Sequence, residues 1–257
     1  MCLYIYIYPP KRYNFQKQQQ INHKQNKTSL RNLIQYKQMT TLGYWGIRGL
    51  AQPIRFLLAY LGVQYTNKAY ANPEEWFGKD KNELGFDFPN IPYLIDGDLK
   101  LTESSAIPIY LIRKHKRNEL LGSSADGSYS EKEVRVAQIV GVIRDLFKEL
   151  TGLCFNPDFK NIKEKLYTEK LELLIKRLGA YLGDKEFIVG TLTYADFLFY
   201  EALSYIRHIY PQAICATLTA YINRFENLPG IKEYIASHAQ ELKVFLPPQR
   251  ATWSGPQ

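Results

Sequence analysis

The sequence has few cysteines and no long apolar run. Its three cysteines, Cys2, Cys154 and Cys215, are widely spaced and form no CxxC pair. An odd number at such spacing argues against a disulfide framework or a zinc site and fits a reducing compartment. Apolar runs are far shorter than the stretch needed to span a bilayer. We therefore expect a cytoplasmic protein that needs no metal and no membrane.

Acidic residues are absent from residues 1–38, which carry seven lysines and arginines and neither glycine nor alanine. The whole chain holds 33 basic and 25 acidic residues, a formal charge of +8. Outside residues 1–38 the balance is 26 basic against 25 acidic, or +1. Nucleic-acid binding requires a cluster of basic contacts. The body of the chain has no such excess, so we expect no nucleic-acid partner.

Residues 1–38 differ in character from the rest. The alternating residues 3–8 could pair as a strand, but Pro9 and Pro10 end it, and polar low-complexity sequence follows. A secretory signal would need an apolar core, and a mitochondrial presequence would be richer in Arg and Ser. The second of two methionines, Met39, directly precedes the first expected strand. We favour a disordered or artefactual extension over these two leader peptides.

From residue 41 the pattern becomes that of a folded domain. Residues 42–45 form a short apolar strand, 52–61 an amphipathic helix, and 63–68 a second strand. A β-α-β unit of this length implies a parallel pair with a right-handed crossover. Residues 92–95 and 99–102 flank Asp96-Gly97-Asp98, a hairpin turn signal.

A helix from Ser104 to about Lys116 completes a βαβ-ββα order, which is a thioredoxin-like α/β domain over residues 39–121. Residues 122–130 are rich in Gly and Ser and read as a linker. The remainder, residues 130–257, is expected to be all-helical, with one apolar stripe over 136–150 and another over 167–181. Thr193 and Asp196 have capping-box spacing and open a helix that we expect to lie at the centre of this second domain.

Three motifs carry a family resemblance. Residues 43–51 read GYWGIRGLA, residues 84–97 read LGFDFPNIPYLIDG, and residues 101–107 read LTESSAI. Together they resemble mu-class glutathione transferases, and the likeness continues to Trp253. The short stretch between Tyr70 and Trp76 resembles the shorter-looped relatives of parasitic flatworms. The resemblance implies a homodimeric detoxification enzyme that uses glutathione as co-substrate and has no bound cofactor.

Such an enzyme must stabilise the thiolate of glutathione. A free thiol has a pKa of about 8.5, so only a few per cent is ionised at neutral pH. Tyr44 stands at the end of the first strand, where an open sheet presents its ligand crevice. The resemblance makes it the catalytic hydrogen-bond donor, whereas a strand tyrosine taken alone would more often pack its ring. Trp45 either lines the peptide site or fills the core.

The resemblance also assigns the tripeptide contacts. Asn90 and Ile91 with a cis Pro92 would expose backbone to the cysteinyl part of glutathione. Ser104, at a helix start that favours an anion, would bind the γ-glutamyl carboxylate. Glu103 would accept from the ammonium group. A plain N-cap role for Ser104 is compatible with this one.

The glycine carboxylate requires cations or donors. By resemblance these are Trp76 and Lys81, although one extra residue between them weakens the match and Lys79 is a rival. A solvated charged loop is the competing interpretation for both lysines. Asp145 would reach the glutathione site of a partner subunit and is expected to face away from its helix's apolar stripe.

The electrophile would bind between the domains. The resemblance to the family, together with helical spacing, implies five residues there: Leu50, Arg144, Phe147, Thr151 and Phe155. Phe155 falls where many mu enzymes carry a second tyrosine, which puts efficient addition to epoxides and enones in doubt. Phe88, an aromatic on an irregular segment, would insert into the partner subunit. Two alternatives stay open: a ligand-binding relative without turnover and a glutathione-dependent isomerase.

Overall fold

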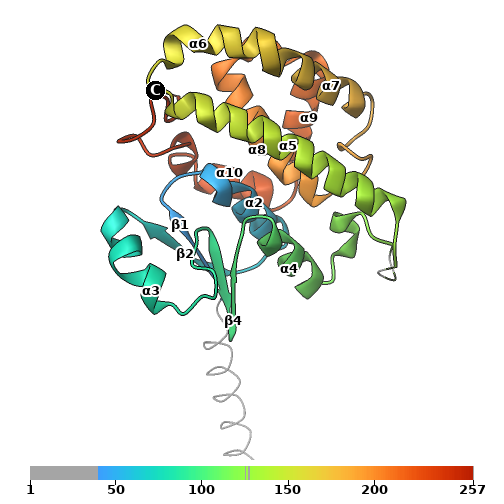
Figure 1. Cartoon of the computed structure of the whole chain (residues 1–257). Helices are drawn as coiled ribbons and strands as arrows, with labels where there is room; N and C mark the ends of the chain where they lie inside the picture. The colour runs from blue at the N-terminus through green and yellow to red at the C-terminus, as the bar shows by residue number, and fades with distance from the viewer. Residues whose placement is uncertain (1–39, 125, 127, 257) are drawn as a thin grey trace, which may run out of the picture. The chain divides into compact units, whose positions relative to one another are not determined.

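The computed structural model describes residues 40–124, 126 and 128–256 (Figure 1). The predicted extension over residues 1–38 and the start at Met39 lie outside the described residues. Within the described part of the chain no helix is both long and apolar enough to cross a membrane. The unit from Thr40 to Gln257 holds both the sheet and the helices.

The described residues form one four-stranded mixed sheet in the order β2-β1-β3-β4. Strand β1 (Thr40–Trp45) pairs in parallel with β2 (Tyr65–Tyr70) and antiparallel with β3 (Tyr93–Asp96). Strand β4 (Leu99–Thr102) completes a hairpin with β3, and Gly97 in its turn has a φ of 62°. The parallel pair and the hairpin were both predicted, and both are confirmed.

Short helices connect these strands. After β1 the chain passes through a 3-10 turn, η1 (Gly49–Ala51), into α2 (Gln52–Tyr60), whose expected apolar stripe is buried. A π-helical turn, η2 (Glu75–Asp80), and α3 (Lys81–Glu83) occupy the stretch that the sequence left irregular. The predicted helix after β4 is α4 (Ala106–Lys114), two residues shorter at each end, and η3 (Asn118–Leu121) follows it.

The second half is helical, as expected, and α5 (Glu131–Phe155) is its longest helix. The predicted stripe over residues 167–181 spans a π-helical turn rather than one regular helix. The remaining elements are α6 (Phe159–Leu166), η4 (Tyr167–Leu171), α7 (Glu172–Leu182), α8 (Tyr194–Ile209), η5 (Pro211–Ala213), α9 (Ala216–Glu226), α10 (Ile231–Ser237) and η6 (Glu241–Lys243).

Helix α8 lies between α5, α9 and α2 (Figure 1). Most of its residues are buried, so the prediction that it forms the centre of the helical part is confirmed. The ring of Phe56 on α2 packs edge-on against Tyr200 of α8 and Phe225 of α9, with centroids 5.3 and 5.9 Å apart. One core cluster therefore runs through the sheet half and the helical half.

The start of α8 is held by a fully buried carboxylate. Asp196 completes the predicted capping box with Thr193, whose backbone N–H donates to it at 2.8 Å. The Ile188 N–H and the Tyr221 hydroxyl also donate to Asp196, at 2.9 and 3.1 Å. A buried donor left without an acceptor costs about 1–3 kcal/mol, so this residue supports several groups at once.

Replacement of Asp196 by Ala is therefore expected to lower the free energy of unfolding by at least about 3 kcal/mol, because four donors, among them the Thr193 hydroxyl, lose the carboxylate as acceptor. Denaturant unfolding of the variant measures this loss. Asp184 is exposed, and Asp184→Ala is the matched control, with an expected change of about 0.5 kcal/mol or less. Similar losses in the two variants would contradict the assigned role.

Candidate active site

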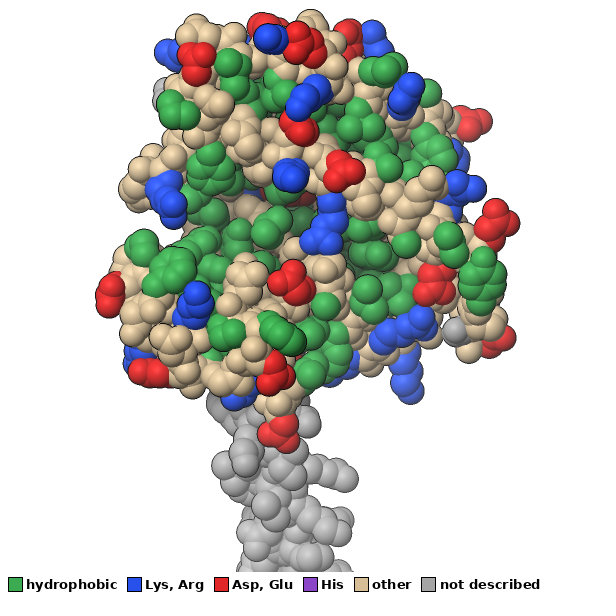
Figure 2. Space-filling model, viewed as in Figure 1, with side chains coloured by type: hydrophobic (Ala, Val, Ile, Leu, Met, Phe, Trp, Pro, Cys, Tyr) green, Lys and Arg blue, Asp and Glu red, His purple; other side chains and the backbone are tan. Residues whose placement is uncertain are grey.

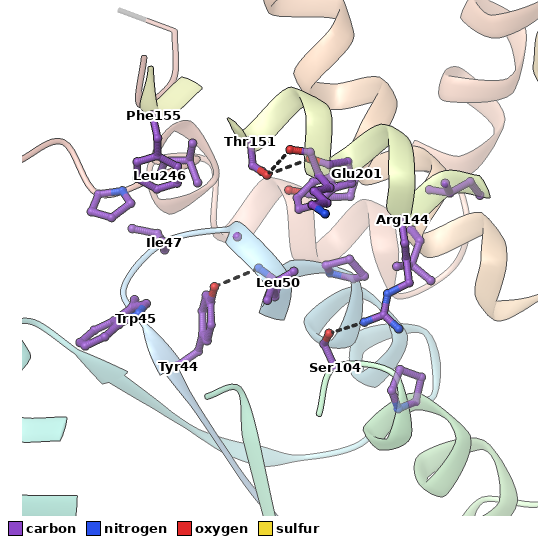
Figure 3. Close-up of a pocket in the computed structure, with 18 of the residues that line it drawn as sticks. Tyr44, Trp45, Ile47, Leu50, Ser104, Arg144, Thr151, Phe155, Glu201 and Leu246 are labelled. Carbon is purple, nitrogen blue, oxygen red and sulfur yellow. Dashed lines mark hydrogen bonds between the residues drawn. The ribbon is translucent and has the colours of Figure 1, made fainter. Parts of the chain in front are cut away.

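A cavity of about 570 Å³ lies between the sheet half and the helical half. The end of β1, the η1 turn and α4 form one wall, while α5, α8 and the C-terminal segment form the other (Figure 3). Figure 2 shows a hollow with hydrophobic side chains inside it and charged side chains of both signs around it. An apolar cavity with a few polar groups is the usual form of a small-molecule site.

Tyr44 projects from the end of β1 into this cavity (Figure 3). Its hydroxyl oxygen accepts a hydrogen bond from the Leu50 backbone N–H at 3.2 Å. Burial raises the pKa of the Tyr44 phenol, while the Leu50 N–H and the Arg55 guanidinium act in the opposite direction. The hydroxyl therefore stays protonated at neutral pH, and its own proton remains available to an acceptor in the cavity.

The loop after β1 requires glycine at one position. Gly49 has a φ of 43°, and a Cβ built on it would lie 2.7 Å from the Tyr44 hydroxyl. Any side chain at this position would displace the phenol or the loop. Arg55 supports the same loop by donating to the Ile47 carbonyl at 2.6 Å and to the Trp45 carbonyl at 3.2 Å.

A buried ion pair joins this loop to the helical half. The Arg48 guanidinium donates to both carboxylate oxygens of Glu201 on α8, at 3.0 and 2.6 Å. The two side chains are 3% and 1% exposed. Arg48 also donates to the Leu242 carbonyl at 3.2 Å, and its backbone N–H donates to Val244. Glu201 lines the cavity, and its charge there is neutralised by Arg48.

Ser104 lies on the far side of the cavity from Phe155 (Figure 3). Its hydroxyl accepts a hydrogen bond from the Arg144 guanidinium at 2.9 Å. The sequence motifs assigned these residues to opposite halves of the site, one to glutathione and one to the electrophile. Their contact across the two halves of the chain follows from the tertiary packing of α5 against the start of α4.

The segment before Ser104 holds strain. Glu103 has a φ of 74°, a left-handed conformation that costs a non-glycine residue about 1–3 kcal/mol. Its carboxylate accepts from the Asn90 side-chain amide at 3.3 Å. The neighbouring Ile91–Pro92 peptide bond is cis, as predicted. The exposed Glu103 and Asn90 thus lie together beside Ser104, which agrees with their assignment to one ligand.

Trp76 and Lys81, the residues predicted to bind the glycine carboxylate, do not line the cavity. Trp76 is only 2% exposed and packs on Tyr93 with ring centroids 5.9 Å apart, so it is chiefly a core residue. The exposed aromatic here is Phe77, which packs against Trp45 at 6.0 Å and lies 5.6 Å from the Lys81 ammonium. The sequence motifs did not single out Phe77, and the roles of Trp76 and Lys81 stay predictions.

The five residues predicted for the electrophile all line the cavity. Trp45 lines it as well, whereas Asp145 and Phe88 lie outside it and are exposed. Sequence reasoning missed the side of the cavity formed by the C-terminal segment, because that segment has no motif or helical period. The missed lining residues of that segment are Leu246, Pro247 and Arg250. Ile47, Lys148 and Tyr194, which lie in segments that the sequence did predict, also line the cavity and were not singled out.

A thioredoxin-like sheet with a tyrosine at the end of its first strand, facing a helical wall, defines the class of protein. Family models agree. One described as the glutathione S-transferase N-terminal domain matches residues 40–113, and one described as the glutathione S-transferase C-terminal domain matches residues 144–238. The chain therefore belongs to the glutathione S-transferase family.

Its relatives include mu-class members. A class-mu 26 kDa glutathione S-transferase isozyme of Fasciola hepatica is 40% identical over 201 residues, which are 76% of this chain and 88% of the relative. Glutathione S-transferase Mu 5 of Homo sapiens is 38% identical over 224 residues, which are 83% of this chain and 98% of the relative. The resemblance to the mu class is thus confirmed.

A solved structure supports the fold. The crystal structure of the glutathione S-transferase Blo t 8 is 33% identical, with a TM-score of 0.70 over 83% of this chain and 99% of that chain. The predicted thioredoxin-like and helical fold class is confirmed. Among the described residues, no group of three His, Cys, Asp or Glu side chains is placed to hold a metal ion.

The Arg48–Glu201 pair yields a stability prediction. Glu201→Met leaves the Arg48 charge buried without a partner, which is expected to cost about 3–5 kcal/mol of unfolding free energy. The double variant Arg48→Met, Glu201→Met removes both charges and is expected to be more stable than the single variant. Arg117→Met breaks a half-exposed pair with Glu119 and serves as control, at about 1 kcal/mol or less.

Denaturant unfolding of the three variants measures whether the unpaired Arg48 charge causes the loss of stability. A double variant no more stable than Glu201→Met would mean that packing, rather than the unpaired charge, dominates at this position.

Proposed function

We propose that the chain conjugates glutathione to hydrophobic electrophiles and that Tyr44 activates the thiol. The observation that carries this proposal is the state of the Tyr44 hydroxyl. Its oxygen already accepts the Leu50 N–H, and burial keeps the phenol protonated. It can therefore donate to the sulfur of glutathione. The α5 wall of the cavity contributes the apolar side chains of Ile143, Phe147 and Phe155, which suit a hydrophobic acceptor.

The reaction then proceeds by differential stabilisation of the thiolate. Lowering the thiol pKa by two units requires about 2.7 kcal/mol of preference for the charged form. One or two well-placed donors in a water-poor site supply such an energy. The thiolate attacks an electrophilic carbon and displaces a leaving group or adds to a double bond. Phe155 offers no hydroxyl proton to the developing product, so displacement is favoured over addition to epoxides and enones.

Glutathione itself would lie along the edge from Ser104 to Lys81. We assign its γ-glutamyl end to Ser104 and Glu103, and its cysteinyl backbone to Ile91. The Glu103–Asn90 hydrogen bond and the strained backbone at Glu103 support this, because strain of this kind persists where a ligand site requires it. Trp76 and Lys81 are assigned to the glycine carboxylate.

The working unit that we propose has a glutathione-binding domain over residues 39–121 and a helical domain over residues 130–257 that lines the electrophile site. We also propose that it acts as a cytoplasmic detoxification enzyme and assembles as a homodimer. The Phe88 ring is 80% exposed, a large apolar surface for an isolated subunit to leave in water. Asp145 is exposed on α5, as a residue reaching a partner subunit would be.

The central test is Tyr44→Phe. Loss of the donor to sulfur is expected to lower kcat by one to three orders of magnitude, or about 2–4 kcal/mol in the transition state, with little change in glutathione affinity. Initial rates with a chloronitrobenzene acceptor and titration calorimetry with glutathione measure the two quantities. Tyr181→Phe, on α7, is the control and should keep the original rate.

A pH profile sharpens this test. Near pH 6.5 a free thiol with a pKa of about 8.5 is almost entirely protonated, so the difference between the original protein and the variant is expected to be largest there. Full activity of Tyr44→Phe under these conditions would eliminate Tyr44 as the activator. Failure to bind glutathione in calorimetry by the unsubstituted protein would overturn the whole proposal.

Assembly is tested by Phe88→Ser. An aromatic side chain inserted into a partner's pocket contributes at least about 2 kcal/mol to association, and a two-fold interface uses it twice. The variant is therefore expected to shift from dimer toward monomer and to lose activity. Sedimentation at micromolar concentration measures the shift. Leu173→Ser, at a side chain 58% exposed on α7, is the control and should remain dimeric.

A further inference from the structure

The cavity carries an unbalanced charge. Its basic residues are Arg144, Lys148 and Arg250, and its acidic residue is Glu201. Glu201 is neutralised by Arg48 in the buried pair described above. Within the described part of the chain, none of the three cavity cations forms an ion pair with a carboxylate. The nearby acid Glu149 on α5 pairs instead with Lys170, and Asp145 is exposed outside the cavity.

The three cations lie along the length of the cavity. Arg144 lies at the end of the cavity near Ser104, and its guanidinium donates a hydrogen bond to the Ser104 hydroxyl (Figure 3). Lys148 follows one helical turn later on the same face of α5, about 6 Å away between Cβ atoms. Arg250 lies near the opposite end, because Thr252, two residues later, donates its backbone N–H to Cys154 beside Phe155. Lys148 and Arg250 therefore face the half of the cavity assigned to the electrophile.

Among the described residues, no ion pair offsets the repulsion between the cavity cations. Like charges one turn apart on a helix are destabilising, and the side chains of Lys148 and Arg250 make no hydrogen bond to a described residue. Lys148 and Arg250 line the cavity together with apolar residues such as Phe147 and Leu246. An anion held beside such a wall is less screened than one in open water, so its attraction to the two cations is strengthened.

We propose that the preferred electrophiles are amphipathic acids, with an apolar body that packs in the cavity and a carboxylate that pairs with Lys148 and Arg250. The inference rests on the proposed transferase function and specifies the acceptor for the same site. Arg144 is not assigned to the acceptor, because it lies beside Ser104, where the γ-glutamyl carboxylate of glutathione is proposed to bind.

A matched pair of aryl chlorides tests this preference. With 4-chloro-3,5-dinitrobenzoate, the glutathione thiolate forms a C–S bond at the chlorinated carbon, and the C–Cl bond breaks to release chloride. The methyl ester of the same acid undergoes the same displacement without the negative charge. We take kcat/KM for each compound, divide it by the uncatalysed rate with glutathione, and compare the two values. The acid is expected to be preferred, and added salt is expected to reduce the preference.

Lys148 and Arg250 are both exposed. The double variant Lys148→Gln, Arg250→Gln is expected to lower the acid-to-ester ratio about fivefold, since one exposed ion pair contributes a factor of about two to five. Lys160→Gln, at an exposed lysine of α6 outside the cavity, is the matched control and should leave the ratio unchanged. An equal preference for acid and ester, or a ratio that survives the double substitution, would overturn the inference while the transferase function stands.

Binding gives a readout that does not depend on turnover. The compounds 3,5-dinitrobenzoate and methyl 3,5-dinitrobenzoate lack a leaving group, so calorimetry reports their affinities directly. Tighter binding of the acid that weakens in the double variant supports the inference, and equal affinities contradict it. If neither aryl chloride is conjugated, the proposed function fails, and these affinities still decide whether the cavity selects an anion.

Discussion

The buried pair between Arg48 and Glu201 is the constraint on which the site depends. Arg48 belongs to the loop after β1, and Glu201 lies in the central helix α8 of the helical half. Two buried charges are tolerated only when they are paired and hydrogen-bonded to each other. The bidentate hydrogen bonds from the Arg48 guanidinium to both carboxylate oxygens of Glu201 meet this requirement. The pair sets where the loop meets the helices and thus where the cavity opens. It also neutralises Glu201, the acidic residue of the cavity, so Arg144, Lys148 and Arg250 have no opposite charge within the cavity.

The position of the Tyr44 hydroxyl follows from this placement. Its phenol is buried by the loop that the ion pair holds, and Gly49 lets the Leu50 N–H approach the hydroxyl oxygen. The same burial that raises the phenol pKa keeps it a donor at neutral pH. A tyrosine in water would also be protonated, but it would exchange hydrogen bonds with solvent. The fold therefore orients the Tyr44 hydroxyl and shields it from water, and it does not ionise the phenol.

Sequence patterns predicted most of the fold. The period-2 and period-3.6 stripes, the Asp96-Gly97 turn and the Thr193–Asp196 capping box are local signals, and each appears in the structure within a few residues. The irregular stretch after β2 was not resolved by pattern, because η2 is a π-helical turn without a regular apolar period. Trp76 shows what pattern could not supply within the site: the sequence did not predict that its ring packs against Tyr93, and its assignment to the glycine carboxylate stays a prediction.

The sequence by itself determined the element order, the family motifs and the chemistry available at Tyr44, because these depend on residue type and on spacing along the chain. Only the tertiary structure decided which distant residues share the cavity. The contact of Arg144 with Ser104, separated by 40 residues, and the approach of Arg250 to the end of α5 belong to this second group. Residues so far apart in sequence leave no periodic signal, since their proximity results from how helices pack rather than from any local preference.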